Sequence, residues 1–251
     1  FCYIKKINNN FIPVRIGAGD WIDPEIFQPY TGSEKEYDLI MIASWLALKR
    51  HNLLFKSLAK IKKSIKRIAL VGYSIGGRTI EHIKNDSRKY DVYNLIEFFE
   101  NISQEKVNEL LKKSKFSVML SKREGASKVI YESFFTDVPV LISSSNVGVN
   151  REHINENTGI ISSDEELHES IIFMMNNFKT FSPRKWAIEH TGCYNSNLKI
   201  NDLLKDISIK SGEKWTKNIY QRKINGMKKC FSKSEKVEYD NELKNLKKFL
   251  R

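Results

Sequence analysis

The chain has 251 residues and a formal net charge of +12, with 41% apolar and 11% aromatic residues. This composition excludes global disorder and supports one large domain, or one and a half, with a real hydrophobic core. No run of 18 apolar residues is present, which excludes an ordinary transmembrane helix. The three cysteines, Cys2, Cys193 and Cys230, are far apart in the sequence. They predict neither a disulfide framework nor a zinc site, and they favour a reducing, cytoplasmic compartment.

The positive charge is concentrated in two stretches. Residues 41–70 carry eight Lys or Arg and no acidic residue, and residues 222–251 carry ten Lys or Arg against four acidic residues. Such basic surfaces bind phosphate-rich ligands, anionic lipid or nucleic acid, or they simply face solvent. In the last stretch, Leu243, Leu246 and Leu250 share one helical face with lysines opposite, which is typical of a helix at a membrane surface.

Residues 37–177 alternate between strand and helix patterns. Strands are expected at 37–43, 68–72, 92–98, 116–120, 138–142 and 158–161. Helices are expected at 52–61, at 77–83, after Ser103 as N-cap, around Glu132, and from Asp164 as N-cap through Met175. The alternation predicts an α/β fold, a Rossmann-like parallel sheet with helices on both faces.

Two further expectations follow from this layout. Residues 178–251 lose the alternation and should form an all-helical extension, with helices starting at Ser182-Pro183 and at Ser196. Ligands of open parallel sheets bind at the carboxyl ends of the strands. We therefore expect the site in the loops that follow residues 43, 72, 98, 120 and 142.

The loop after the expected strand 116–120 is the most informative segment of the chain. Glu124 and Glu132 bracket it with seven residues between them, and Gly125, Ala126 and Ser127 stand at the expected start of a helix. A helix start presents free backbone N–H groups that can hold an anion such as a phosphate. A carboxylate on such a helix can accept hydrogen bonds from sugar hydroxyls.

This segment resembles the E-x7-E signature of family 4 (group 1) of the retaining, nucleotide-sugar-dependent glycosyltransferases, which have the two-domain GT-B fold. The resemblance rests on an ordered series of residues over about forty positions. The series comprises Glu124-Gly125, Glu132, Pro139-Val140, Asn146-Val147-Gly148, Glu152 and Glu156-Asn157-Thr158-Gly159.

The resemblance implies roles for individual residues. Glu132 would bond the ribose hydroxyls of the donor nucleotide, and Glu124 would act at the transferred sugar or reaction centre. Gly125 would permit close approach of the backbone, and Ala126 and Ser127 would offer N–H groups to phosphate or sugar. The segment that includes Phe98 would contact the base through its backbone.

The family also carries an R-x4-K-G-like pattern after its first strand, whose cations neutralise the donor's diphosphate. Lys49 matches the Lys, whereas the Arg position falls on Ser44. Either Arg50 compensates for this departure, or phosphate binding is weaker than is typical of the family. The loop Gly72-Tyr73-Ser74-Ile75-Gly76-Gly77 follows no phosphate-loop pattern, and we interpret it as a tight turn.

The resemblance divides the chain into three parts. Residues 1–36 would be the interdomain hinge, because Ile16-Gly17-Ala18-Gly19-Asp20 and Ile26-Phe27-Gln28-Pro29 resemble the family's hinge. Residues 37–177 would be the donor-binding domain and residues 178–251 the helical extension. The chain starts at Phe1, so we expect the N-terminal GT-B domain to be missing and this chain alone to be inactive.

The implied activity is transfer of a sugar from a nucleotide-diphosphate sugar (UDP-, GDP- or ADP-linked) with retention, with no tightly bound cofactor or metal. The acceptor stays open between a glycan, a lipid and a protein. A peripheral membrane contact is expected, and a specific nucleic acid partner is not, because the aromatic residues are not interleaved with the basic runs. Two alternatives remain open: a basic α/β module that binds nucleic acid, and a non-catalytic GT-B relic.

Overall fold

The computed structural model describes residues 11–30, 32 and 34–219, with 234, 237, 240–242, 244 and 245 further along. The predicted leucine stripe (Leu243, Leu246 and Leu250) lies outside the described residues, as do Cys2 and Cys230. Within the described part, no helix is long and apolar enough to cross a membrane.

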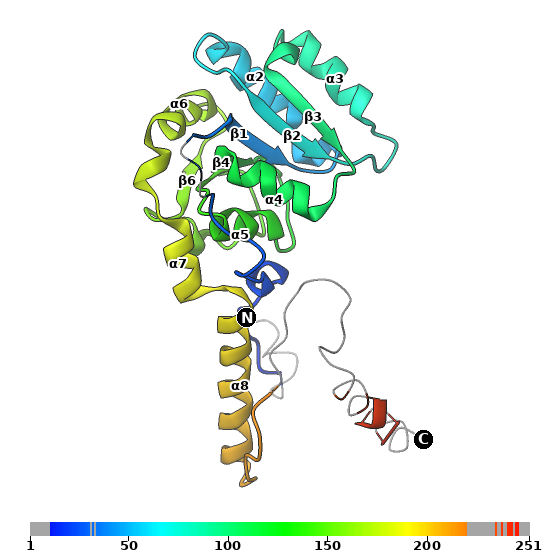
Figure 1. The fold of residues 1–251 in the computed structure, drawn as a ribbon, viewed down its shortest axis with the longest axis vertical. Helices are drawn as coiled ribbons and strands as arrows, with labels where there is room; N and C mark the ends of the chain where they lie inside the picture. The colour runs from blue at the N-terminus through cyan, green and yellow to red at the C-terminus, as the bar shows by residue number, and fades with distance from the viewer. Residues whose placement is uncertain are drawn as a thin grey trace.

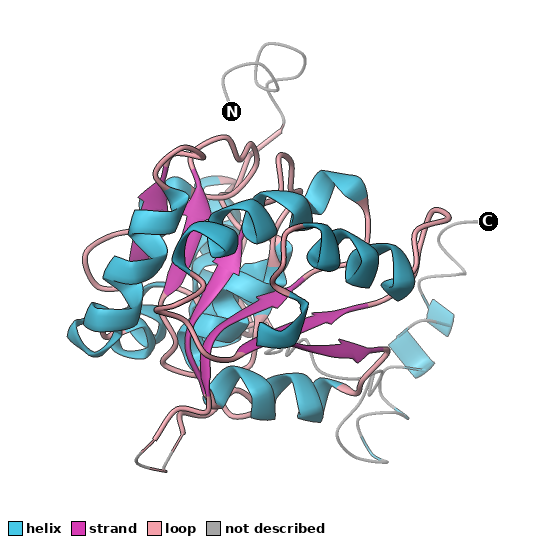
Figure 2. Cartoon of the chain, turned by 90° about the horizontal axis from the view of Figure 1, so that it is seen from above, coloured by secondary structure: helices cyan, strands magenta, loops and turns pink. Residues whose placement is uncertain are grey.

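A six-stranded sheet forms the centre of the molecule (Figures 1 and 2). Its strands are β1 Tyr37–Ile42, β2 Ile68–Gly72, β3 Ile96–Glu100, β4 Ser114–Met119, β5 Val140–Ser143 and β6 Gly159–Ser162. Their order is β3-β2-β1-β4-β5-β6, and every neighbouring pair is parallel. The predicted α/β fold with a Rossmann-like parallel sheet is confirmed.

Helices cover both faces of this sheet, as Figure 2 shows. The helices α2 His51–Ile61, α3 Ile80–Lys89 and α6 Leu167–Asn177 share one hydrophobic core with one face of the sheet. The helices α4 Gln104–Lys112 and α5 Lys128–Phe135 pack on the other face. Because side chains alternate along a strand, Leu39 and Met41 of β1 enter the first core while Ile40 enters the second. All three are buried, as expected for a parallel sheet covered on both sides.

Two helices follow the sheet domain, α7 Pro183–His190 and α8 Gly192–Lys210. Figure 1 shows α8 extending away from the sheet, and most of its distal residues are at least partly exposed. Short 3-10 turns complete the described elements: η1 Ala18–Trp21, η2 Ala47–Lys49, η3 Tyr93–Leu95, η4 Arg151–His153 and η5 Phe178–Thr180.

The N-terminal segment packs onto the domain. Ile22 and Phe27 belong to the same core as Ile130 and Phe134 of α5. The buried Asp20 carboxylate accepts a hydrogen bond of 2.6 Å from the Thr191 hydroxyl at the start of α8. The segment therefore joins α5 to α8, and its assignment as an interdomain hinge stays a prediction.

Three elements start more than two residues from the position expected from the sequence. The helix expected at 77–83 begins at Ile80, because Gly76 and Gly77 both take positive φ angles, 61° and 77°, in a tight turn. The strand expected at 92–98 begins at Ile96, after η3. The helix expected from Ser196 already starts at Gly192, where the N–H of Cys193 donates to the carbonyl of Ile22.

Two expected caps have different outcomes. The Ser103 hydroxyl accepts a hydrogen bond from the Lys106 amide, which confirms the predicted N-cap of α4. Asp164 is not the N-cap of α6, because Glu166 holds that position and the Asp164 carboxylate binds other groups. Its partners belong to the candidate site.

Candidate functional site

The site predicted from the sequence lies at the carboxyl edge of the sheet. The chain runs outward from β1 to β2 and β3 and then returns to β4 on the opposite side of β1. The loops after β1 and β4 therefore leave the sheet in opposite directions, and such a switch point opens a crevice where ligands bind. Lys49 follows β1 and Glu124 follows β4, so the strand order places both residues beside this crevice.

Lys49 and Glu124 form an ion pair. The Lys49 Nζ donates to Glu124 Oε1 at 2.5 Å, and the two side chains are 19% and 15% exposed. The loops themselves are joined by a backbone hydrogen bond of 3.1 Å from Lys122 to Leu48. The structure thus brings together a cation and a carboxylate that the sequence analysis selected for separate reasons.

The loop after β5 supports the Glu124 loop from the other side. The Glu124 amide donates to the Val147 carbonyl, and the Val147 amide donates to the Lys122 carbonyl, both at 2.9 Å. Gly148 has a φ of 109°, and a Cβ built on it would lie 1.7 Å from the Glu124 carbonyl oxygen. A glycine is required here because the two backbones approach too closely for any side chain.

Gly125, Ala126 and Ser127 stand directly before α5. Ser127 is the N-cap residue, yet its side chain accepts no capping hydrogen bond. A Cβ built on Gly125 would meet no heavy atom within 4 Å, so neither packing nor a positive φ requires this glycine. The first amides of α5 have no partner within the helix, and they can bind an anion.

Glu132 lies inside α5 and is buried, with 8% of its surface exposed. Among the described residues its carboxylate has no hydrogen-bond partner. Burial raises the pKa of Glu132 to about 7, and the positive charge of Lys128 opposes this shift. The carboxyl group is therefore set to change its charge near neutral pH, as groups at functional sites often are.

Arg50 lies in the same loop as Lys49, but its guanidinium is held by protein groups. Its Nη1 donates to the Leu120 carbonyl at 3.5 Å and to the Ser143 hydroxyl at 3.3 Å, and its Nη2 pairs with Asp164. Burial alone would raise the pKa of Asp164, but hydrogen bonds from Arg50, Ser143 and Ser145 outweigh burial and lower it. Asp164 is thus the counter-ion of Arg50.

Phe98 is not brought next to Lys49 and Glu124. It lies two residues before the end of β3, and its ring stacks on Tyr93 with ring centroids 5.6 Å apart. Its side chain packs against the core under α2 and α3. Its predicted base contact through the backbone stays a prediction.

Residues that the sequence analysis missed stand at the end of β3. Glu100 Oε1 accepts a hydrogen bond of 2.7 Å from the buried Trp45 indole and one of 2.6 Å from the Ser74 hydroxyl. These residues come from the ends of β3, β1 and β2, so only the strand order shows that they meet. Trp45 also explains why residue 72 is a glycine, since a Cβ at this position would lie 2.6 Å from the indole ring.

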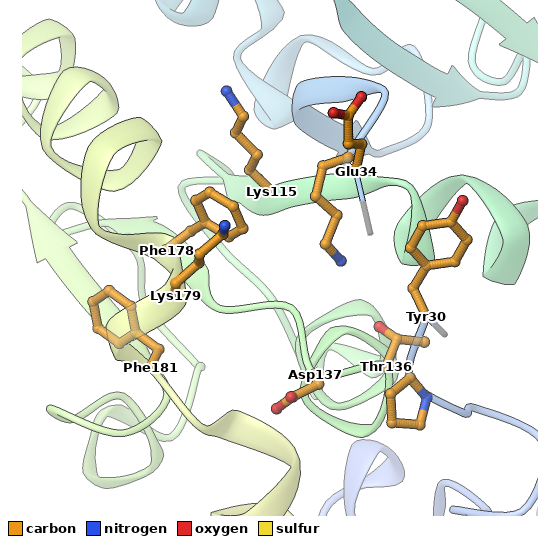
Figure 3. Close-up of a pocket in the computed structure, with 10 residues that line it drawn as sticks. Tyr30, Glu34, Lys115, Thr136, Asp137, Phe178, Lys179 and Phe181 are labelled. Atoms are coloured by element: carbon orange, nitrogen blue, oxygen red, sulfur yellow. The ribbon is translucent and has the colours of Figure 1, made fainter. Parts of the chain in front are cut away.

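One cavity lies at the opposite edge of the sheet (Figure 3). It measures about 530 Å³, and its walls include Lys115 at the start of β4, Asp137 after α5 and Lys179 of η5. This amino edge is remote from the carboxyl ends of the strands, so the cavity is not the predicted site. In the described ranges, no group of His, Cys, Asp or Glu side chains could hold a metal ion.

Comparison with solved structures places the fold among known proteins. The C-terminal domain of a glycosyl transferase group 1 family protein (LpcC) from Francisella tularensis matches with a TM-score of 0.58 at 11% identity, covering 67% of this chain and 97% of that domain. A glycosyltransferase from Rickettsia africae ESF-5 matches with a TM-score of 0.64 at 19% identity, covering 74% of this chain and 55% of that one. Anabaena Alr3699/HepE in complex with UDP gives a TM-score of 0.64 at 14% identity, covering 74% and 56%.

The fold is a Rossmann-like domain of the kind that forms the C-terminal half of GT-B glycosyltransferases. The family model for glycosyl transferases group 1 matches residues 23–186, which is more than half of the chain. The chain therefore belongs to the glycosyl transferases group 1 family. It spans only about half the length of the Rickettsia and Anabaena proteins, and no curated protein matches its sequence.

Proposed function

We propose that this chain supplies the donor-binding domain of a retaining glycosyltransferase that takes a sugar, such as a hexose, from a nucleoside diphosphate sugar. The observation that carries the proposal is the Lys49–Glu124 pair at the switch point between β1 and β4. Beside it stand the first amides of α5, which have no partner within the helix, and within α5 lies the carboxyl group of Glu132, which has no hydrogen-bond partner among the described residues. A cation and an anion-binding helix start suit the diphosphate of a nucleotide, and a carboxylate suits its ribose hydroxyls.

Each residue has a role in this proposal. Lys49, with the amides of Gly125, Ala126 and Ser127, binds the diphosphate. Glu132 accepts hydrogen bonds from the ribose hydroxyls. The segment at the end of β3 that contains Phe98 contacts the base through its backbone.

The chemistry separates the sugar from a charged leaving group. The bond between the anomeric carbon and the diphosphate oxygen breaks, and that oxygen keeps the electron pair. The acceptor hydroxyl oxygen then bonds to the same face of the anomeric carbon and gives its proton to the departing diphosphate oxygen. Lys49 stabilises the negative charge that develops on the diphosphate, which is a common source of rate enhancement.

Glu124 has two successive partners in this scheme. Without a donor its carboxylate holds Lys49 at 2.5 Å, so the ammonium group is already oriented toward the crevice edge. When the diphosphate arrives, Lys49 gains a second anion, and Glu124 becomes available to the transferred sugar at the reaction centre.

The similar structures support a nucleotide ligand. One Anabaena Alr3699/HepE structure contains UDP, and a second contains UDP and glucose. For this chain, the donor would be a UDP-, GDP- or ADP-linked sugar, and the acceptor a glycan, a lipid or a protein. No tightly bound cofactor is part of the proposal.

A peripheral membrane contact forms a second part of the proposal. Three lysines, hereafter the α2 lysines, are exposed on α2 and in the turn that follows it. They are Lys56, Lys60 and Lys63. Among the described residues none of the three forms an ion pair, and the neighbouring helix α6 exposes 48% of Phe173. Exposed lysines on one helix and an exposed ring on its neighbour suit an anionic lipid surface, where each cation contributes about 1 kcal/mol.

The direct test is calorimetry and thermal shift with UDP, GDP, ADP and a short DNA duplex. We expect one nucleoside diphosphate to raise the melting temperature, because a ligand that binds only the native state stabilises it by mass action. Glu132→Ala should lower the affinity for that nucleotide by roughly one to two decades, since hydrogen bonds to a charged group contribute about 1.5–3 kcal/mol. Stabilisation by DNA alone, or by none of the nucleotides, would overturn the proposal.

A further inference from the structure

Arg50 has an unusual backbone conformation for a residue with a side chain. Its φ and ψ are 62° and 42°, which is the left-handed region, at the junction between η2 and α2. A Cβ makes this conformation unfavourable, so it persists only where surrounding contacts maintain it. The Arg50 amide donates to the Ala47 carbonyl at 3.0 Å, and its carbonyl accepts from the Leu53 amide at 3.0 Å. The Arg50 amide therefore closes the η2 turn, and the Arg50 carbonyl accepts the first hydrogen bond of α2.

The side chain of Arg50 supplies contacts that maintain this conformation. Its guanidinium binds the Leu120 carbonyl beyond β4, the Ser143 hydroxyl at the end of β5 and the Asp164 carboxylate beyond β6. The side chain is only 13% exposed. One arginine thus joins the loop after β1 to the carboxyl ends of three other strands.

The counter-ion of Arg50 is itself held in place. Asp164 accepts hydrogen bonds of 2.7 Å from the Ser143 hydroxyl and 3.0 Å from the Ser145 hydroxyl. The positive charge of Arg50 is therefore neutralised by a carboxylate that three donors orient. A guanidinium in this setting is a poor ligand for a diphosphate, because it would have to leave a partly buried ion pair.

We propose that Arg50 is a positioning residue, which fixes the neighbouring Lys49 beside Glu124, and that it is not a phosphate ligand. This inference rests on the proposed function of the site. The Lys49 amide is bonded to the Leu46 carbonyl, and the Leu48 carbonyl accepts from Lys122, so the η2 turn carries Lys49 as one unit. Releasing Arg50 frees that turn and lets the ammonium group leave Glu124.

The substitution Asp164→Asn separates the two roles by the sign of its effect. If Arg50 bound phosphate, removing its counter-ion would free a positive charge and strengthen diphosphate binding. If Arg50 positions Lys49, the same substitution loosens the η2 turn and weakens binding. We expect calorimetry to show about tenfold weaker diphosphate binding in Asp164→Asn and in Arg50→Gly. We expect Arg50→Lys to lie between them and the wild type, because a lysine cannot make all three contacts.

Hydrogen exchange gives a second measurement that needs no nucleotide. The Lys122 amide donates to Leu48, so a free η2 turn should speed its exchange roughly tenfold in Arg50→Gly and in Asp164→Asn. Arg184 is the matched control, because its guanidinium binds the carbonyls of Phe27, Phe135 and Pro24 on the other side of the molecule. Arg184→Gln should lower the melting temperature without changing exchange at Lys122 or the diphosphate affinity.

The outcomes distinguish this inference from the proposed function. Unchanged exchange at Lys122, or tighter diphosphate binding in Asp164→Asn, would overturn the positioning role. If the wild-type chain binds no nucleoside diphosphate, the proposed function fails, and the exchange rates alone decide whether Arg50 holds the loop.

Discussion

Replacing Glu132 by glutamine removes an ionisable group from the interior while keeping its shape. The Glu132 side chain is buried in α5, and among the described residues its carboxylate accepts no hydrogen bond. Burial raises the pKa of Glu132 from the ordinary 4.5 to about 7, against the opposing charge of Lys128. Ionising this group in the folded chain therefore costs free energy that glutamine does not incur.

The size and sign of the effect follow from the two pKa values. In the unfolded chain the group loses its proton near pH 4.5, whereas the folded chain retains it up to about pH 7. Between these limits the native state binds more protons, so the free energy of unfolding falls as the pH rises. The difference corresponds to about 3 kcal/mol, since one pKa unit is worth about 1.4 kcal/mol. We expect Glu132→Gln to match the wild type near pH 4 and to exceed its stability by about 3 kcal/mol at pH 8.

Urea denaturation of both proteins from pH 4 to pH 8 measures this difference, because all other titrating groups are shared. Stability curves that run parallel across the range would refute the raised pKa and the burial argument behind it. Ligand binding gives an independent check, since ribose hydroxyls donate to the ionised form. Wild-type affinity for the nucleoside diphosphate should be about tenfold higher at pH 8 than at pH 6, and the affinity of Glu132→Gln should not show this rise.

Three further predictions concern the loops and the surface. Lys49→Ala should lower the affinity for a nucleoside diphosphate by roughly one to two decades but leave the affinity for the nucleoside nearly unchanged, because a point charge acts on the phosphates. Equal losses of affinity for the two ligands in calorimetry would show that the lysine has a structural role. Gly148→Ala should cost roughly 2 kcal/mol or more, since the new Cβ overlaps the Glu124 carbonyl, whereas Gly125→Ala should stay within about 0.5 kcal/mol. Similar melting temperatures for the two variants would contradict the close approach. Replacing the α2 lysines by glutamate should abolish co-sedimentation with anionic vesicles at low salt, while neutral vesicles bind neither protein. Failure of the wild type to bind anionic vesicles would reject the membrane contact.

The sheet could be predicted from the sequence because each strand is a short apolar run between polar loops. The strand expected at 68–72 has those bounds in the structure, and all of its residues are buried. Ser103 could be predicted as a cap because its hydroxyl acts locally, three residues from its partner. Prediction from neighbouring residues failed where contacts between distant parts of the chain determine the start of an element. Thr191 and Cys193 start α8 early because they bind Asp20 and Ile22, which lie at the other end of the chain.

Residues of the candidate site could be selected from the sequence, but the contacts between them could not be predicted. Lys49 and Glu124 were selected from motifs, but their meeting depends on β1 and β4 being neighbours. Arg50 occupies the position of the glycine in the R-x4-K-G-like pattern, and its φ of 62° gives the physical reason for a glycine there. Its guanidinium could be located only from the folded strand ends. The contact between Trp45 and Glu100 could not be predicted either, because it also depends on which strand ends are neighbours.

The loops at the carboxyl edge form a connected frame before any ligand arrives. The ion pair between Lys49 and Glu124 joins the first loop to the second, and the Glu124 amide joins the second to the third through Val147. Arg50 fastens the first loop to the ends of β4 and β5. A frame of this kind reduces the entropy lost when a ligand binds, which is the main advantage of a preorganised site. On the proposed function, a substitution therefore need not touch the nucleotide to weaken nucleotide binding. Gly148 and Arg50 should affect binding through the position of Glu124 and Lys49, and the two effects should be non-additive because they act on one connected frame.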